Sequence, residues 1–275
     1  MRLLRALTPA ACIEWFIVSN LAFLGVDIYL AHAANAFAAA AEWAPLAFSA
    51  AATLLLVPGL FSASLRARTR AVAIAVAVCS IVVGVVGMLF HLESAFFGSQ
   101  TLRDLVYTAP FAAPLAYVGV GLLLLLTRME RAHSPAWSAW IVFLALGGFV
   151  GNLALSLLDH AQNGFFHLAE WVSVGIAAFG VSFLLVAVLR REDARFLRIC
   201  LGLLAIYAGV GVVGFALHVA ANLRRPGATL FERFVFGAPA FAPLLFADLA
   251  LLAALGLWSM LRAPAAEDGK APASP

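Results

Sequence analysis

The chain has 275 residues, of which 64% are hydrophobic and only 11% are charged, and its formal net charge is +3. A soluble domain is about 45–50% apolar and about 25% charged, so this composition excludes a soluble globular protein. The small positive charge requires no nucleic-acid partner, because arginines that face anionic lipid at a membrane surface account for it.

Apolar runs of about 20 residues recur along the whole chain, and each is long enough to cross a bilayer core of about 30 Å as a helix. Eight such runs are predicted in chain order: 11–31, 44–62, 70–91, 105–127, 138–160, 168–189, 197–219 and 238–261. The sequence therefore predicts an all-α polytopic membrane protein with eight transmembrane helices. Segment 263–275, which is rich in proline and alanine, is predicted to be a disordered cytoplasmic tail.

The first run is predicted to be a span and not a cleaved signal peptide. It carries Glu14, Asn20 and Asp27, which are too polar for the core of a signal sequence. It also resembles a later run, because NLAFLGVD from Asn20 matches NLALSLLD from Asn152.

A polar motif occurs twice in the chain. It reads HAANAFAAAAEW from His32 and HAQNGFFHLAEW from His160, 128 residues later. A second matched pair of segments aligns further residues between the two halves: His91 with His218, Asp104 with Glu232, Pro110 with Pro239, and Pro114 with Pro243. These matches predict a tandem repeat, with one four-helix bundle in residues 1–131 and another in 132–262. Each copy has an even number of spans, so a pseudo-twofold axis along the membrane normal is predicted to relate them.

The basic residues predict the orientation. Of the 17 lysines and arginines, 13 fall on one side of the predicted spans, and the other side has only Arg103, Arg224, Arg225 and Arg233. Cytoplasmic loops carry the excess of basic residues, so both termini are predicted to be cytoplasmic in a bacterial inner membrane. The matched histidines then lie near the outer face.

The repeated polar residues are the candidate site. His32 and His91 end the first and third runs and Glu42 begins the second; the corresponding residues of the second copy are His160, His218 and Glu170. Two histidines and a carboxylate form a known ligand set for zinc or non-heme iron. Two histidines on facing helices also serve as the axial ligands of a heme. The sequence leaves open a transition metal (zinc, iron or copper) and heme b as the cofactor.

The same residues have a second interpretation. Histidine and tryptophan are common at membrane interfaces, and Trp43 and Trp171 fit an aromatic belt. Glu42 and Glu170 are also placed to cap the N-termini of the helices that follow them. Asn35 and Asn163 either orient the imidazoles or simply begin the loops.

Some polar residues occur in one copy only. His167 has no counterpart, because Ala39 occupies that position. Asp248 lies near the middle of the last run, where an ionisable side chain is a functional hypothesis by default. The alternative for Asp248 is a hydrogen bond with Asn20 or Asn152.

The paired histidines in two four-helix bundles resemble, in plan, the arrangement in heme A synthases. The local motifs of that family are absent, and the resemblance implies no activity here. The sequence favours a metal- or heme-binding membrane protein with a role in redox transfer or in a metal-dependent membrane reaction, and it leaves open whether the chain is an enzyme. The alternative is a small transporter or a non-catalytic scaffold subunit. The expected partners are the lipid bilayer and, in the second case, other membrane subunits.

Overall fold

The computed structural model describes residues 8–190, 193–227 and 229–262. The predictions for the tail 263–275 and for Arg2, Arg5, Arg191 and Lys270 therefore lie outside the described residues. The elements are, in chain order, α1 (Pro9–Ala33), η2 (Ala40–Glu42), α2 (Trp43–Phe61), α3 (Ala63–Arg68), α4 (Arg70–Glu93), α5 (Phe96–Ser99), α6 (Leu102–Tyr107), α7 (Leu115–Met129), α8 (Pro135–Gln162), α9 (Glu170–Leu189), α10 (Ala194–Arg224), α11 (Leu230–Val235) and α12 (Leu244–Arg262).

Seven of the described helices are long and apolar enough to cross a membrane: α1, α2 with η2, α4, α8, α9, α10 and α12. Large apolar side chains such as Leu54, Val82, Phe143 and Phe179 are exposed on their outer faces, where lipid would contact them. The helical membrane class predicted from composition is confirmed.

The predicted continuous helix over 105–127 is wrong. It is divided into α6 and α7 by a non-helical segment from Thr108 to Pro114. Pro110 and Pro114 explain the break, because proline lacks an N–H and disfavours helical geometry in the residue before it. α7 has only 15 residues, or about 22 Å of helix, which is less than a bilayer core of about 30 Å.

The last predicted span is shortened in the same way, by a proline pair before the helix. The predicted span over 238–261 begins only at Leu244, and Pro243 comes directly before α12. The first proline of each pair lies in the segment before the helix, and the second borders the helix.

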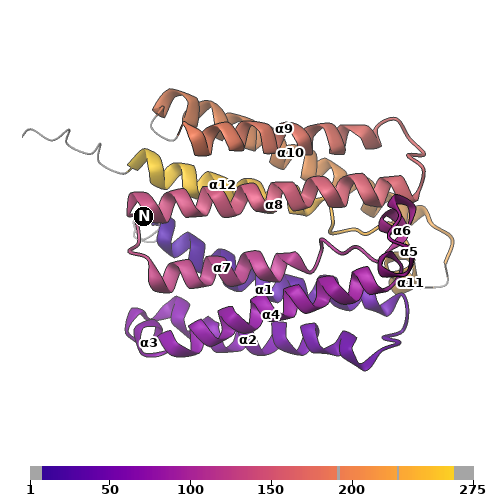
Figure 1. Cartoon of the computed structure of the whole chain (residues 1–275), viewed down its shortest axis with the longest axis horizontal. Helices are drawn as coiled ribbons and strands as arrows, with labels where there is room; N and C mark the ends of the chain where they lie inside the picture. Colours follow the sequence, from indigo (N-terminus) through magenta and orange to yellow (C-terminus); the bar gives the residue numbers. More distant parts are fainter. Residues whose placement is uncertain (1–7, 191–192, 228, 263–275) are drawn as a thin grey trace, which may run out of the picture.

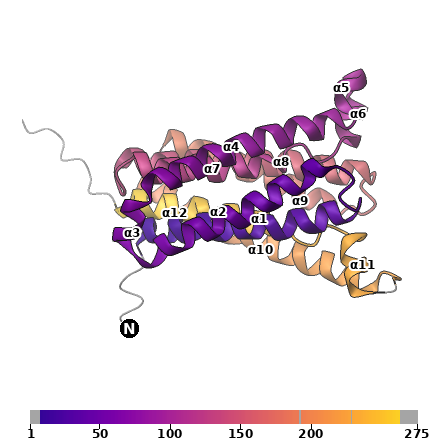
Figure 2. The same ribbon diagram turned by 90° about the horizontal axis from the view of Figure 1, so that it is seen from below.

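The longer helices form two groups, α1, α2, α4 and α7 in one and α8, α9, α10 and α12 in the other (Figures 1 and 2). In the first group, α1 and α4 each pack against both α2 and α7, so α1 and α4 lie diagonally across a bundle. In the second, α8 and α10 each pack against both α9 and α12. Contacts of α1 with α12 and of α7 with α8 join the groups. A pseudo-twofold relation would produce this pattern, and the division into tandem repeats stays a prediction.

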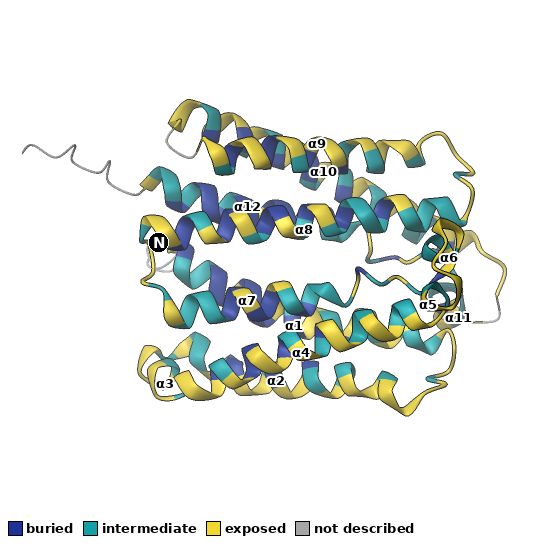
Figure 3. Cartoon of the chain, viewed as in Figure 1, coloured by how far each residue is buried: buried dark blue, intermediate teal, exposed yellow. Residues whose placement is uncertain are grey.

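The core lies where the two groups meet. Half of the residues in the apolar stretch of α12 are buried, against 22–39% in the corresponding stretches of the other spanning helices. α12 is therefore the most enclosed of these helices. Figure 3 shows buried residues concentrated on α7, α8 and α12, whereas α2 is largely exposed.

The bundle has two different ends (Figure 1). We call them the α3 end, where α3 carries Arg66 and Arg68, and the α6 end, where α5, α6 and α11 lie. Arginines at the α3 end agree with a cytoplasmic location for that end. The orientation itself stays a prediction.

Candidate functional site

The repeated motif adopts the same backbone conformation in both copies. After α1 the chain turns through Ala36 and Phe37, whose φ angles are 56° and 52°, and the Phe37 N–H donates to the His32 carbonyl over 3.1 Å. After α8, Gly164 and Phe165 have φ angles of 68° and 52°, and the equivalent bond from Phe165 to His160 measures 3.0 Å. Left-handed residues commonly end helices, but they are uncommon outside glycine.

This turn places the aromatic residues of the motif against each other. The ring of Phe37 stacks on Trp43 at 4.1 Å between centroids, and the ring of Phe165 stacks on Trp171 at 4.0 Å. The stacks stabilise the left-handed turns and fix the start of the next helix. Phe37 and Phe165 belong to the motif that repeats in the sequence, but the sequence did not predict that they stack on the tryptophans.

The turn also brings each glutamate to its histidine. His32 Nδ1 lies 3.0 Å from Glu42 Oε2 in a hydrogen bond, and both side chains are largely buried. His160 Nδ1 lies 3.3 Å from Glu170 Oε2, a contact that is longer and less well aligned than a hydrogen bond. The structure therefore places the motif histidine and the motif glutamate together in each half.

The second oxygen of each glutamate holds the turn. Glu42 Oε1 accepts the Ala39 N–H at 3.2 Å and the Asn35 amide at 3.3 Å. Glu170 Oε1 accepts the backbone N–H of His167 at 3.3 Å. One carboxylate oxygen of each glutamate thus lies at the histidine and the other holds the turn before the next helix. The predicted role of the glutamates as metal ligands stays a prediction.

The asparagines of the motif differ between the halves. Asn35 contacts Glu42 and so acts on His32 indirectly, whereas Asn163 donates to the Asp159 carbonyl at 3.2 Å. His167 is exposed, and only its backbone takes part in the site.

The other two histidines form hydrogen bonds with the segments that carry the proline pairs. His91 Nδ1 lies 2.9 Å from the Pro110 carbonyl oxygen, and His218 Nδ1 lies 2.8 Å from that of Pro239. In a continuous helix the carbonyl of residue 110 would accept the N–H of residue 114, but Pro114 has none. The spacing of four residues between the prolines thus removes the usual helical donor to the first carbonyl. That carbonyl accepts the N–H three residues on, from Ala113 at 3.0 Å and from Ala242 at 3.3 Å, and the imidazole as a second donor. The sequence aligned these residues without indicating that they meet.

The hydrogen-bond partners determine which ring nitrogen of each imidazole carries the proton. A carbonyl oxygen only accepts, so Nδ1 of His91 and His218 must carry the proton, and in the neutral ring the lone pair is on Nε2. A carboxylate also only accepts, which gives His32 the same tautomer. Nε2 of these histidines is therefore the nitrogen that is left for another partner.

The first pair of histidines meets across the bundle. The ring centroids of His32 and His91 lie 6.2 Å apart, with 65° between the ring planes, although α1 and α4 are diagonal. Among the described residues, His160 and His218 make no ring contact of this kind, and the ring of His160 lies 6.1 Å from that of Phe165. In the described ranges, no three histidine, cysteine, aspartate or glutamate side chains come together in a way that could hold a metal ion.

The remaining candidates lie apart from the histidines. Asp248 Oδ1 accepts the Asn20 amide at 3.0 Å, which joins α12 to α1, whereas Asn152 donates to Tyr207. Asp104 and Glu232, which align in sequence, both close capping boxes at the starts of α6 and α11. Hydrogen bonds from the Ser99 and Thr101 hydroxyls hold the pKa of the Asp104 carboxyl below its usual value.

The sequence did not indicate one buried ion pair. The Arg128 guanidinium binds both carboxylate oxygens of Glu14, with Nη2 2.9 Å from Oε2, and both side chains are nearly buried. The partners are 114 residues apart, so no local pattern could relate them. They join α1 to α7 close to the α3 end, away from the histidines.

The fold defines the class of this protein: it is an integral multi-pass membrane protein. A scan against protein-family models found no match. Searches among curated proteins and among solved structures found none either.

Proposed function

We propose that each half of the chain binds one heme b, through His32 and His91 in the first half and His160 and His218 in the second. The observation that carries the proposal is the meeting of His32 and His91, whose ring centroids lie 6.2 Å apart while both Nδ1 atoms are hydrogen-bonded elsewhere. Two imidazoles that bind opposite sides of one metal ion through Nε2, at about 2 Å each, have centroids about 6 Å apart. At a tetrahedral angle the same bonds give about 5 Å.

The number of available ligands favours heme over a bare ion. A porphyrin supplies four of the six ligands of its iron, so the protein needs to supply only two. A bare ion held by two histidines would need Glu42 as a third ligand, but Glu42 holds Nδ1 of His32.

The surroundings of the histidines support the same conclusion. Metal-binding histidines usually donate their other N–H to a carboxylate or a backbone carbonyl, which fixes the ring orientation. Here Glu42 and the carbonyls of Pro110 and Pro239 take that role. Cofactor sites in helix bundles are built from side chains on facing helices, as these are. Two hemes at the α6 end would make the chain a one-electron carrier at one membrane face.

The absorption spectrum of the full chain purified in detergent tests this proposal. We expect a Soret band and two hemes per chain. His91→Ala and His218→Ala should each leave one heme, and the double variant none. His133→Ala is the matched control, because His133 is exposed in the connection between α7 and α8 and should not change the heme content.

A bare metal ion is the second candidate, because Glu42 lies 3.0 Å from His32 and could turn toward a shared ion. Stoichiometric zinc, iron or copper without a Soret band would support it and contradict the heme proposal. Protein that binds neither heme nor metal would contradict both, and would favour the transporter or scaffold alternative.

A further inference from the structure

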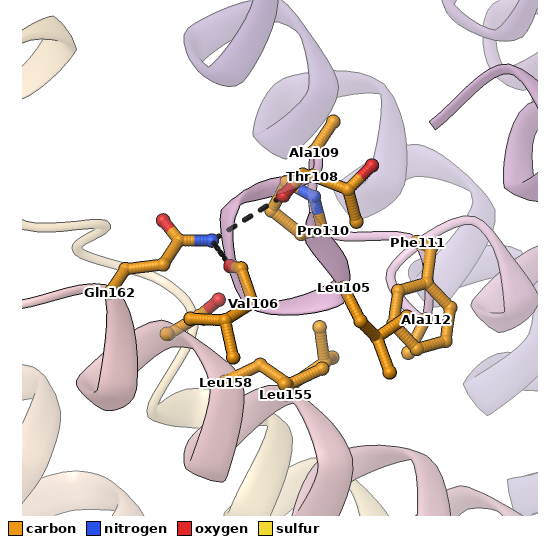
Figure 4. A pocket seen from close by; sticks show the side chains of 11 residues that line it. Leu105, Val106, Thr108, Ala109, Pro110, Phe111, Ala112, Leu155, Leu158 and Gln162 are labelled. Atoms are coloured by element: carbon orange, nitrogen blue, oxygen red, sulfur yellow. Dashed lines mark hydrogen bonds between the residues drawn. The ribbon is translucent and has the colours of Figure 1, made fainter. Parts of the chain in front are cut away.

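Gln162, the last residue of α8, reaches across the boundary between the two halves of the chain (Figure 4). Its Nε2 donates to the carbonyl oxygens of Val106 and Thr108, at 2.7 and 3.4 Å. Both acceptors lie where α6 ends and the non-helical segment toward α7 begins. A side chain of the second half therefore holds the segment of the first half that carries Pro110.

Thr108 connects this contact to His91. Thr108 is 2% exposed, and its hydroxyl donates to the backbone carbonyl of His91 and lies 2.9 Å from the hydroxyl of Ser94. The same Ser94 hydroxyl accepts the backbone N–H of the residue before Pro110, at 2.9 Å. The position of this segment fixes the Pro110 carbonyl, which accepts the hydrogen bond from Nδ1 of His91. Gln162 thus lies at one end of a hydrogen-bonded chain that has the His91 imidazole at the other.

The corresponding segment of the second half is held from within that half. Asn222 of α10 donates Nδ2 to the Ala238 carbonyl at 2.8 Å, and its Oδ1 accepts the Ala238 N–H at 2.7 Å. Ala238 directly precedes Pro239, whose carbonyl accepts the hydrogen bond from His218. The support for His218 therefore comes from its own helix, α10, one turn further along the chain.

The repeated motif supplies the link between the halves in one direction. Gln162 aligns with Ala34, whose methyl group cannot donate a hydrogen bond. From this asymmetry we infer that Gln162 is a positioning residue for His91, so that the first histidine pair depends on the second half of the chain. The importance of His91 rests on the proposed function, but the orientation of its imidazole can be measured without any cofactor.

The two N–H donors of the Gln162 amide are the physical cause of this dependence. Without them the carbonyls of Val106 and Thr108 lose hydrogen bonds, and the segment shifts to satisfy them in another way. The bond from His91 Nδ1 to the Pro110 carbonyl then weakens, and the neutral ring carries its proton on Nε2 in a larger fraction of molecules. Because Nε2 is the nitrogen that the Nδ1–H tautomer leaves for another partner, Gln162 keeps the lone pair of His91 available.

Nitrogen NMR of the full chain with isotope-labelled histidine tests the inference, in detergent and with any bound metal or heme removed. The His91 signals are identified by their loss in His91→Ala. Gln162→Met keeps the length of the side chain but removes both donors. We expect the ratio of the Nδ1–H to the Nε2–H tautomer at His91 to fall about two- to fivefold, the factor that corresponds to the net strength of one hydrogen bond. The signals of His218 should stay as in the wild type.

The neighbouring asparagine provides the matched control. Asn163 follows Gln162 directly but donates to the Asp159 carbonyl of its own half, so Asn163→Ala should leave the His91 signals unchanged. Gln162→Glu should repeat the effect of Gln162→Met, because a carboxylate cannot donate, and it replaces that variant if Gln162→Met does not fold.

Thermal unfolding of the same samples separates positioning from a general loss of stability. The tautomer ratio at His91 should change in the Gln162 variants even where the Tm equals that of the wild type. Unchanged His91 signals in both Gln162 variants would overturn the inference, and so would an equal change at His91 and His218. These outcomes do not depend on a Soret band, so the inference and the heme proposal can fail separately.

Discussion

Nδ1 of His91 lies 2.9 Å from the carbonyl oxygen of Pro110, in the segment that interrupts the fourth predicted span. The interruption and the contact have one cause. Pro114 cannot donate the helical hydrogen bond to Pro110, so the helix breaks. The Pro110 carbonyl then accepts the imidazole of His91 in addition to the N–H of Ala113. His218 and Pro239, followed by Pro243, repeat the relationship at 2.8 Å.

Pro114→Ala should weaken the first heme site. The new N–H at position 114 would compete for the Pro110 carbonyl, and His91 would lose the partner that orients it. Loss of such an orienting partner costs about 10–100-fold in metal affinity, which heme titration of the apoprotein would measure. Pro58→Ala, inside α2, is the control and should leave the affinity unchanged. Unchanged affinity in Pro114→Ala would show that the carbonyl does not orient His91.

Glu42→Gln should separate heme from a bare metal ion. A heme bound by His32 and His91 keeps both iron ligands in this variant, so its Soret band should remain. The midpoint potential should rise, because a neutral amide makes the imidazole a weaker electron donor than a carboxylate does. A redox titration in detergent measures this change. Complete loss of the bound species would identify Glu42 as a direct ligand and favour the bare ion.

Gly84→Ala and Gly211→Ala should destabilise the bundles. A Cβ at Gly84 would lie 2.8 Å from the Pro114 carbonyl oxygen, and one at Gly211 would lie 2.7 Å from that of Pro243. These neighbours are backbone atoms and cannot turn away, so we expect a loss of about 1–3 kcal/mol in unfolding free energy, measured by denaturation in mixed micelles. Gly209→Ala, also in α10, meets nothing within 4 Å and should leave stability nearly unchanged.

The stability of α6 should depend on pH through Asp104. Hydroxyl groups of Ser99 and Thr101 lower the pKa of this carboxyl from its usual 3.8. The stabilisation is therefore fully present above that value and is lost as the pH falls through the lowered pKa of the folded state. Hydrogen exchange of the α6 amides should show protection that decreases only in strong acid. In Ser99→Ala the decrease should begin at a higher pH, and in Asp104→Asn the pH dependence should disappear.

The orientation can be tested with single cysteines in a cysteine-free background. Gly98→Cys and Gly227→Cys lie at the α6 end and should react with a membrane-impermeant maleimide in intact cells. Ala132→Cys lies at the α3 end and should react only after lysis. Labelling of Ala132→Cys alone would invert the orientation and place the histidines on the cytoplasmic side.

The sequence alone determined the membrane class, because runs of apolar residues leave a chain no soluble fold in which to bury them. It also located the histidine–glutamate motif. His32 and Glu42 are only ten residues apart, and the turn between them depends on local backbone conformation. The turn therefore corresponds to a short sequence motif, which can be recognised because it occurs in both halves. The prediction of a continuous helix over 105–127 failed because it relied on the hydropathy of the segment and gave too little weight to Pro110 and Pro114, which interrupt the helix.

Tertiary structure alone decided which residues meet across the bundle. His91 and Pro110 are 19 residues apart, and Asn20 and Asp248 are 228 apart, so their contacts depend on how helices pack and not on any local spacing. A sequence pattern records which residue types recur, whereas the nitrogen left free on each imidazole depends on the three-dimensional position of its partners.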